Sequence, residues 1–180
     1  MLKLDTKQVL ADALVELCRT KPLDKITVQN ITDFCGAGRQ TFYNHFKDKE
    51  ELIEYIYLCD RKRGAEIIKK EYSLKKHMKM LLDICTEKRA FYVYAYAVHG
   101  QNSLSESVFK AAVDYYTNLV IQKGGKEAVD DEMEMAIRFN CYGDLCCVKD
   151  WIKKEIRCSS EKLAEIMIEN MPERLKKYLD

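Results

Sequence analysis

Prolines, glycines and long apolar runs are scarce in this sequence. Only 2 of its 180 residues are proline and 7 are glycine, so few positions interrupt a helix. No apolar run approaches the ~20 residues of a membrane-spanning helix. The start, "MLKLDTKQVLADALVELC", also lacks the apolar core and cleavage site of a secretory signal. We therefore expect an all-α protein of the cytoplasm, with no membrane partner.

Neither net charge nor cysteine spacing indicates a site. The 30 basic and 29 acidic residues nearly cancel, so any nucleic-acid surface must be a local patch. The 8 cysteines form no C-x-x-C pair, and no histidine stands near enough to complete a zinc motif. We expect no metal, no cofactor and free cysteines that pack as small hydrophobes. The alternative for the adjacent Cys146 and Cys147 is that they sense oxidants or soft metals.

Recognised catalytic patterns are missing as well. The sequence has no G-x-S-x-G elbow, phosphate loop, metal motif or Ser-His-Asp arrangement. Its histidines, His45, His77 and His99, are far apart along the chain. We expect that the protein is not an enzyme.

Apolar periodicity predicts short helices at the N-terminal end. The first runs from Thr6 to about Thr20, because Pro22 forces the chain out of the helical region. Thr27 is a plausible N-cap for the second. The residues of this second helix expected to face inward are Val28, Ile31 and Phe34.

A tight turn separates the second helix from a third. Gly36 can adopt a positive φ without steric cost, which ends one helix and redirects the chain. The third helix is expected from about Arg39 to Asn44, and a fourth begins at Asp48 with a D-x-x-E capping box to Glu51. Two helices joined by a small-residue turn are typical of a helix-turn-helix.

The third helix has two contrasting faces. At ~100° per residue, Phe42 and Phe46 fall about 40° apart and are expected in the core, whereas Gln40 and Asn44 point about 160° away. Amide side chains so placed can bond adenine N6 and N7 in a major groove. Hydroxyls on the flanks can reach phosphates. The flanking residues are Thr41 and Tyr43.

Three further residues can assist such a surface. Arg39 can reach a guanine or a phosphate, and Thr27 offers a hydroxyl at a helix N-terminus. Lys49 stands in the first turn of the fourth helix, where a cation opposes the helix dipole unless a phosphate lies beside it. We expect Lys49 to clamp a phosphate. Three-helix arrangements of this kind also occur in proteins that never touch DNA.

The stretch "ITVQNITDFCGAGRQTFYNHFKDKEEL" resembles the DNA-binding signature of the TetR family of bacterial transcriptional regulators. The resemblance implies a three-helix DNA-binding domain over residues 1–63, connecting helix included. It also implies a homodimer that enters successive major grooves of a near-palindromic double-stranded operator. The positions that it assigns to phosphates are Tyr43, His45, Thr27, Thr41 and Lys49, and those that it assigns to bases are Arg39, Gln40 and Asn44.

Three residues depart from the family pattern. Such proteins commonly have Ala at Cys35, Ser or Thr at Gly38, and Gly at Gln40. Loss of the cap at Gly38 costs a few tenths of a kcal/mol. The amide of Gln40 is expected to change the base contacts.

Residues 64–180 are expected to form a helical regulatory and dimerisation domain, for about nine helices in all. "RAFYVYAYAVHG" also fits a strand by periodicity, but no partner strand is evident, so we interpret it as a helix. Pro172 must break or kink the last element. The other helices are expected at Ser73 to Thr86, Ser103 to Gln122, Asp131 to Glu155, and from Ser160 onward.

The resemblance also implies an unknown small-molecule effector in this domain. Buried tyrosine hydroxyls need partners, so an aromatic cluster suits a polar-edged ligand, although ordinary core packing is the alternative. His99 can instead cap a helix end beside Gly100. The candidate ligand residues are Tyr92, Tyr96, His99, Phe109, Tyr116, Phe139 and Tyr142.

The last long helices are expected to form a four-helix dimer interface. This tail resembles the short regulatory domains of TetR-like proteins near dihydroxyacetone-kinase regulators. The candidate interface residues are Leu145, Val148, Trp151, Ile152, Leu163, Ile166 and Met167.

The sequence therefore predicts a ligand-responsive homodimeric DNA-binding regulator, in this family most often a repressor and in some members an activator. The rival interpretation is a helical ligand-binding co-regulator or adaptor without DNA binding of its own. The presence of Tyr43 and Lys49 argues against that rival.

Overall fold

The computed structural model describes residues 5–68, 73–98 and 103–179. Within these ranges the chain forms ten α-helices, two short 3-10 helices and no strand, which confirms the all-α prediction. The α-helix beyond the nine expected is the four-residue α10 (Glu173–Lys176), which begins directly after Pro172. Pro172 thus breaks the last element, as predicted.

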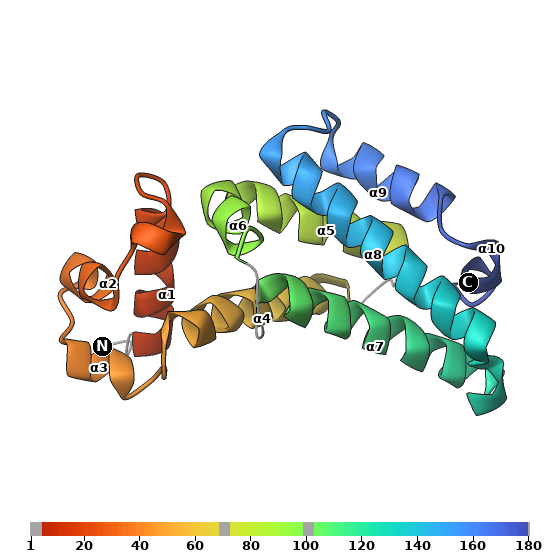
Figure 1. The fold of residues 1–180 in the computed structure, drawn as a ribbon, viewed down its shortest axis with the longest axis horizontal. Coiled ribbons are helices and arrows are strands. Elements are labelled where there is room, and N and C mark those ends of the chain that lie inside the picture. The colour runs from red at the N-terminus through yellow and green to blue at the C-terminus, as the bar shows by residue number, and fades with distance from the viewer. Residues whose placement is uncertain (1–4, 69–72, 99–102, 180) are drawn as a thin grey trace.

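Three helices and a connecting helix make up the N-terminal part, at the left of Figure 1. The elements are α1 (Thr6–Leu17), η1 (Leu23–Lys25), α2 (Val28–Cys35), α3 (Arg39–Tyr43) and α4 (Lys49–Ile68). Asp5 caps α1, and Thr27 caps α2 in a box with Asn30. These caps satisfy backbone N–H groups that a helix start leaves free, so local sequence fixes where both helices begin.

The N-terminal core gathers large apolar side chains from all four helices. Leu10, Ile31, Phe42 and Leu52 are fully buried there. Phe34, expected inward, is instead 56% exposed, so that prediction is wrong. The buried or half-buried residues of α2 include Ile31, Thr32 and Cys35, and at ~100° per residue Phe34 lies roughly 110° from the middle of that arc.

Helix α4 leads from the N-terminal part to the rest of the molecule. Asp48 caps it by accepting from the Glu51 amide at 2.8 Å, whereas Glu51 reaches back to the Lys47 amide. The helix continues without a break past Gly64 to Ile68. The predicted division of the chain at residue 63 therefore falls inside a continuous helix.

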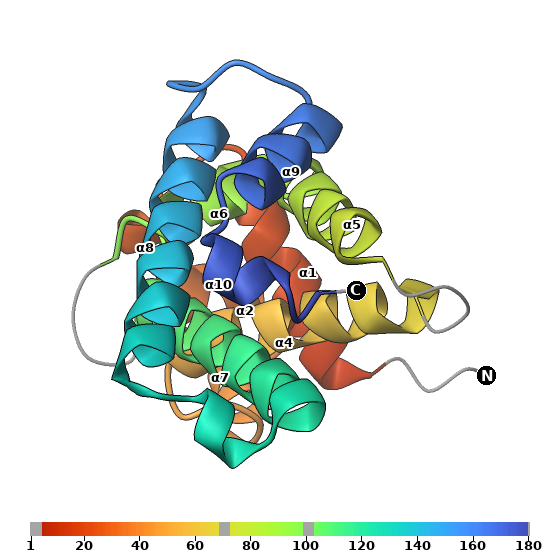
Figure 2. The same ribbon diagram turned by 90° about the vertical axis from the view of Figure 1, so that its right-hand side faces the viewer.

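The remaining helices form the larger part of the molecule. Seen along its long axis, α4 and the C-terminal helices are arranged in a ring, with the last helix in front (Figure 2). Besides α10, they are α5 (Leu74–Glu87), α6 (Arg89–Ala95), α7 (Leu104–Gly124), η2 (Lys126–Ala128), α8 (Asp131–Lys153) and α9 (Ser160–Glu169).

Packing between these helices decides which faces are buried. Helix α9 packs on α5, α7 packs on α8, and α4 contacts both α5 and α7. Ser159 caps α9, which begins at Ser160 as expected, and the Ser160 hydroxyl donates to the Asp83 carboxylate of α5. Helix α6 contacts η1 and α1, so the N-terminal core continues into the C-terminal helices.

Candidate functional site

The turn between α2 and α3 sets the direction of α3. Gly36 has φ 69°, a left-handed conformation that a side chain would strain. Phe42 and Phe46 are both buried, as predicted, with ring centroids 5.8 Å apart. Tyr43 makes an edge-to-face contact with Phe42 and is itself 47% exposed. Two buried aromatics therefore hold a five-residue helix whose other face is open.

The three candidate base readers lie on that open face. Arg39, Gln40 and Asn44 are all exposed. The Nε2 of Gln40 donates to Oδ1 of Asn44 at 3.1 Å, which ties the two amides together. The bonded pair still has the carbonyl oxygen of Gln40 and both N–H groups of the Asn44 amide for other partners.

The candidate phosphate contacts Thr27, Thr41 and His45 are at least partly exposed. Thr27 is exposed, although its hydroxyl accepts from the Asn30 amide at 3.2 Å as the cap of α2. Thr41 and His45 are half-buried on the flanks of α3. Each of these side chains is therefore at least partly accessible to a binding partner.

Lys49 has contacts that the sequence did not predict. Its Nζ donates to the carbonyl oxygens of Leu23 at 2.7 Å and Ile26 at 3.0 Å. The ammonium thus ties the start of α4 to η1 and the turn before α2. These acceptors are backbone atoms more than 20 positions away, so no local pattern could reveal them. Its role at a phosphate stays a prediction.

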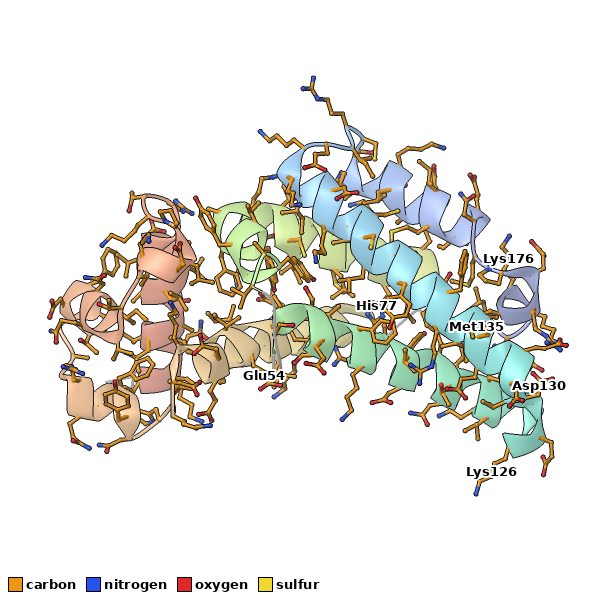
Figure 3. All side chains as sticks on the ribbon, viewed as in Figure 1. Glu54, His77, Lys126, Asp130, Met135 and Lys176 are labelled. Carbon is orange, nitrogen blue, oxygen red and sulfur yellow. The ribbon has the colours of Figure 1, made fainter. Side chains whose placement is uncertain are left out.

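A cavity of about 200 Å³ lies among the C-terminal helices and α4. Four of the predicted ligand residues line it, together with two of the predicted interface residues, Leu145 and Val148. His77, labelled in Figure 3, is also part of its wall. The four lining residues that the sequence predicted are Tyr92, Tyr96, Phe109 and Tyr116.

The other predicted ligand residues do not line this cavity. Phe139 and Tyr142 face outward from α8 and are 74% and 57% exposed, so their assignment is wrong. Tyr142 stacks on the outside of Phe109, with ring centroids 4.1 Å apart. His99 falls outside the described residues. Helical projection could not separate the two faces of α8, because both are apolar.

Polar side chains that the sequence analysis missed also reach the cavity. Asp60 of α4 is buried and binds Nζ of Lys88 at 2.5 Å and the hydroxyl of Tyr92 at 2.7 Å. Burial, with the nearby Cys85 and Asp60, raises the pKa of Tyr92, so its phenol stays protonated. The network fixes α4 against α6 at the wall of the cavity.

Two cavity groups have pKa values displaced toward their neutral forms. Burial raises the pKa of Asp144 to about 7, and the single bond from Asn140 at 2.9 Å opposes this only partly. Burial and the charge of Arg61 lower the pKa of His77. The hydroxyl of Tyr115 is buried with no hydrogen-bond partner among the described residues. Perturbed groups of this kind concentrate at functional sites.

Four of the predicted dimer-interface residues are not at the surface of the subunit. Trp151, Ile152, Leu163 and Met167 are buried in the core of the subunit, so they cannot form a surface for a partner. Trp151 also donates through Nε1 to the Cys158 carbonyl at 2.8 Å. Packing of α9 on α5 buries Leu163 and Met167, and α8 packs on α5 and α6. Of the predicted interface residues, Ile166 is exposed.

The opposite face of α8 carries an exposed apolar stripe. Met135 (labelled in Figure 3) is 66% exposed and begins a series at spacings of four, three and four residues. That spacing places all members on one side of the helix. The stripe consists of Met135, Phe139, Tyr142 and Cys146.

The described residues contain neither a membrane-spanning helix nor a cluster of metal ligands. No helix in residues 5–68, 73–98 and 103–179 is long and apolar enough to cross a membrane. Within the same ranges, no group of three His, Cys, Asp or Glu residues could hold a metal ion.

Comparison with known families accounts for both parts of the chain. Residues 10–56 match the family described as bacterial regulatory proteins, tetR family, and residues 72–173 match a transcriptional regulator C-terminal region. The chain belongs to the TetR family. It is therefore a transcriptional regulator of the DNA-binding, helix-turn-helix type.

Individual TetR-family relatives agree with this assignment. One is the HTH-type dhaKLM operon transcriptional activator DhaS of Lactococcus lactis subsp. lactis (strain IL1403), 31% identical over 90 residues. That match spans 48% of this chain and 46% of the relative, about half of each. The expected family is thus confirmed, and so is the expected likeness to regulators of dihydroxyacetone kinase, of which DhaS is one.

Solved structures share the fold over nearly the whole chain. A dihydroxyacetone kinase operon activator DhaS gives a TM-score of 0.68 at 21% identity, covering 97% of this chain and 98% of that one. A TetR transcriptional regulator from Rhodococcus sp. RHA1 gives 0.59 at 13% identity, over 93% and 98%. NalD, the secondary repressor of the MexAB-OprM multidrug efflux pump in Pseudomonas aeruginosa, gives 0.57 at 16%, over 92% and 93%. At these identities the likeness concerns the fold.

Proposed function

We propose that this regulator is a cytoplasmic homodimer that binds a near-palindromic operator and responds to a small molecule, with no enzymatic activity of its own. The observation that carries this proposal is the open face of α3. Its exposed amides and Arg39 stand opposite two fully anchored aromatics. Packing in the core does not explain such a face, whereas a helix that lies in a DNA major groove needs polar side chains that reach the base edges.

The bonded amides of Gln40 and Asn44 are proposed to read bases as a unit. The free carbonyl of Gln40 and the free N–H of Asn44 form an acceptor and a donor side by side. Adenine presents the complementary pair at N6 and N7. Tyr43, Thr41, His45 and Thr27 would hold the flanking phosphates, which position the helix without specifying sequence.

The apolar stripe of α8 is proposed as the dimer interface, together with Ile166 of α9. Large apolar side chains that are more than half exposed on one helix face favour association with another surface. A two-fold axis brings the same stripe of a second copy against the first. Such a dimer sets a fixed distance between its two α3 helices.

Effector binding is proposed to act through α4. Tyr57, Asp60 and Arg61 of α4 line the cavity, and Lys49 at the other end of the helix holds η1 and the turn before α2. A ligand that prefers one position of α4 would therefore shift the two α3 helices relative to each other. A dimer that no longer matches two half-sites loses DNA affinity, which corresponds to repression relieved by the effector.

Activation is a second candidate direction of control. The relative from L. lactis is named a transcriptional activator, and this favours the same direction here. Transcription from the bound promoter, measured with and without the regulator in a purified system, separates the two. A decrease on adding protein supports repression, and an increase supports activation.

Selection from a random double-stranded DNA pool, at a stated salt concentration, tests the proposed function. We expect enrichment of a near-palindrome whose half-sites lie about one helical turn apart. Recovery of no enriched sequence, with purified folded protein, would support the adaptor without DNA binding instead.

A further inference from the structure

One carboxylate in the cavity has no cation to balance it among the described residues. Asp144 of α8 lines the cavity and accepts a single hydrogen bond, from Asn140. Its neighbours include no lysine, arginine or histidine at ion-pair distance among the described residues. A carboxylate withdrawn from water without a counter-ion is unfavourable, and a ligand cation would remove that cost.

The other charged groups of the cavity are already accounted for. Asp60 is paired with Lys88 and accepts the Tyr92 hydroxyl. Arg61 is exposed and lies over the ring of Tyr57, 5.7 Å from its centroid. Solvent screens an exposed guanidinium more strongly than a largely buried carboxylate. Asp144 therefore decides which charge the cavity prefers.

A second group in the same cavity lacks a partner. The hydroxyl of Tyr115 is buried and has no hydrogen-bond partner in residues 5–68, 73–98 and 103–179, and Tyr115 lines the cavity. A phenol can accept from an ammonium or donate to a ligand oxygen. The rest of the wall is mainly aliphatic and aromatic, including Leu81, Val108 and Phe109. Such walls suit the apolar body of a ligand.

We infer that the cavity binds a small organic cation, whose ammonium pairs with Asp144 and whose apolar body packs on the aromatic and aliphatic walls. The inference rests on the proposed function and names the chemical class of its effector. A cavity of about 200 Å³ is smaller than the roughly 300–1,000 Å³ of sites for drug-sized ligands. A single-ring amine therefore matches its size.

Three probes of one shape and different charge test this inference. They are 2-phenylethylamine, 2-phenylethanol and phenylacetate, which are cationic, neutral and anionic. Calorimetric titration is performed at about pH 8, above the pKa of about 7 of Asp144. We expect the amine to bind at least about tenfold more tightly than the other two, since a charged hydrogen bond is added.

Two variants identify the source of that preference. Asp144→Asn keeps the size of the side chain and is expected to abolish the preference for the amine. Asp114→Asn removes the same charge from an exposed position of α7 that does not line the cavity. This control variant should retain the preference for the amine. Thermal melts confirm that both variants fold.

Three outcomes overturn the inference. They are equal or tighter binding of the alcohol or the acid, no binding of the amine to the wild type, and a preference that survives in Asp144→Asn. Operator binding by the ligand-free protein is measured in parallel. Retained operator binding alongside any of these outcomes rejects the cation alone, whereas absence of all DNA binding rejects the proposed function.

Discussion

At the scale of single residues, α3 separates side chains that support the fold from side chains that are free to bind. Phe42 and Phe46 are buried, and Gln40 and Asn44 are exposed, as the 3.6-residue period required. The contacts of Lys49 and Asp144 had no such basis. Lys49 bonds carbonyl groups of residues far away in the sequence, and Asp144 lines a cavity that exists only after several helices pack together.

Lys49→Met is expected to weaken both the fold and DNA binding. It removes a charged donor from two carbonyl groups, and each such bond contributes about 1.5–3 kcal/mol when well formed. Because Lys49 is only half-buried, we expect the free energy of unfolding to fall by about 1–3 kcal/mol in urea titrations. The highly exposed Lys47→Met, the control, should stay within about 0.5 kcal/mol.

The same Lys49 variant should lose affinity for operator and scrambled DNA alike, because it changes the position of α3 and not its base-reading atoms. Anisotropy titrations of both sequences measure this. A Lys49→Met protein with unchanged stability and unchanged DNA affinity would contradict the role assigned to its two carbonyl bonds.

Asp144 is expected to make stability fall as pH rises. Its pKa is raised from 3.8 to about 7 on folding, so between these values the folded state holds a proton that the unfolded state has lost. The stabilisation that this proton gives the folded state disappears as the pH rises through about 7. Between pH 5 and pH 8 the free energy of unfolding therefore falls by about 2–3 kcal/mol at most, at ~1.4 kcal/mol per pH unit.

Comparison with Asp144→Asn isolates this pH dependence. His77, with its lowered pKa, titrates below about pH 6.5 and acts in the opposite direction. The difference between the two proteins in urea unfolding should shrink from pH 8 to pH 5, and a constant difference would contradict the assignment. The other titratable or charged groups that line the cavity are Asp60, Arg61, Tyr57, Cys85, Tyr92, Tyr96, Tyr115, Tyr116 and Cys141.

At the scale of elements, local patterns predicted the helices well and their outward faces poorly. Caps at Thr27 and Asp48 and the turn at Gly36 are set by neighbouring residues, so sequence located them. Helix α8 has two apolar faces, and only its packing on α5, α6, α7 and α10 decides which one is buried. Trp151 and Phe139 were therefore each assigned to the wrong face.

The stripe on α8 leads to a prediction about oligomeric state. Phe139→Glu places a charge at the centre of the proposed interface, where its burial would be unfavourable. We expect sedimentation to show a dimer for the wild type and a monomer for this variant. Leu58→Glu, at another half-exposed apolar position on α4, should leave the dimer intact. A dimer that persists in Phe139→Glu would contradict the proposed interface.

At the scale of the whole molecule, one continuous helix joins the cavity to the DNA-binding part. Helix α4 contributes Asp60 to the cavity wall and Lys49 to the contact with η1, and α6 touches η1 and α1 as well. The family resemblance predicted a pocket and a DNA-binding domain in one chain. The side chains that connect them became evident only in the folded structure.

The open face of α3 is proposed to read DNA bases. The most direct test of this proposal is an anisotropy titration, at one stated salt concentration, of the selected operator and a scrambled duplex with wild type, Gln40→Ala and Tyr43→Ala. We predict that Gln40→Ala loses most of its preference for the operator, by about 1–3 kcal/mol, whereas Tyr43→Ala loses affinity for both duplexes equally. Unchanged operator preference in Gln40→Ala, together with unchanged affinity in Tyr43→Ala, would contradict the account.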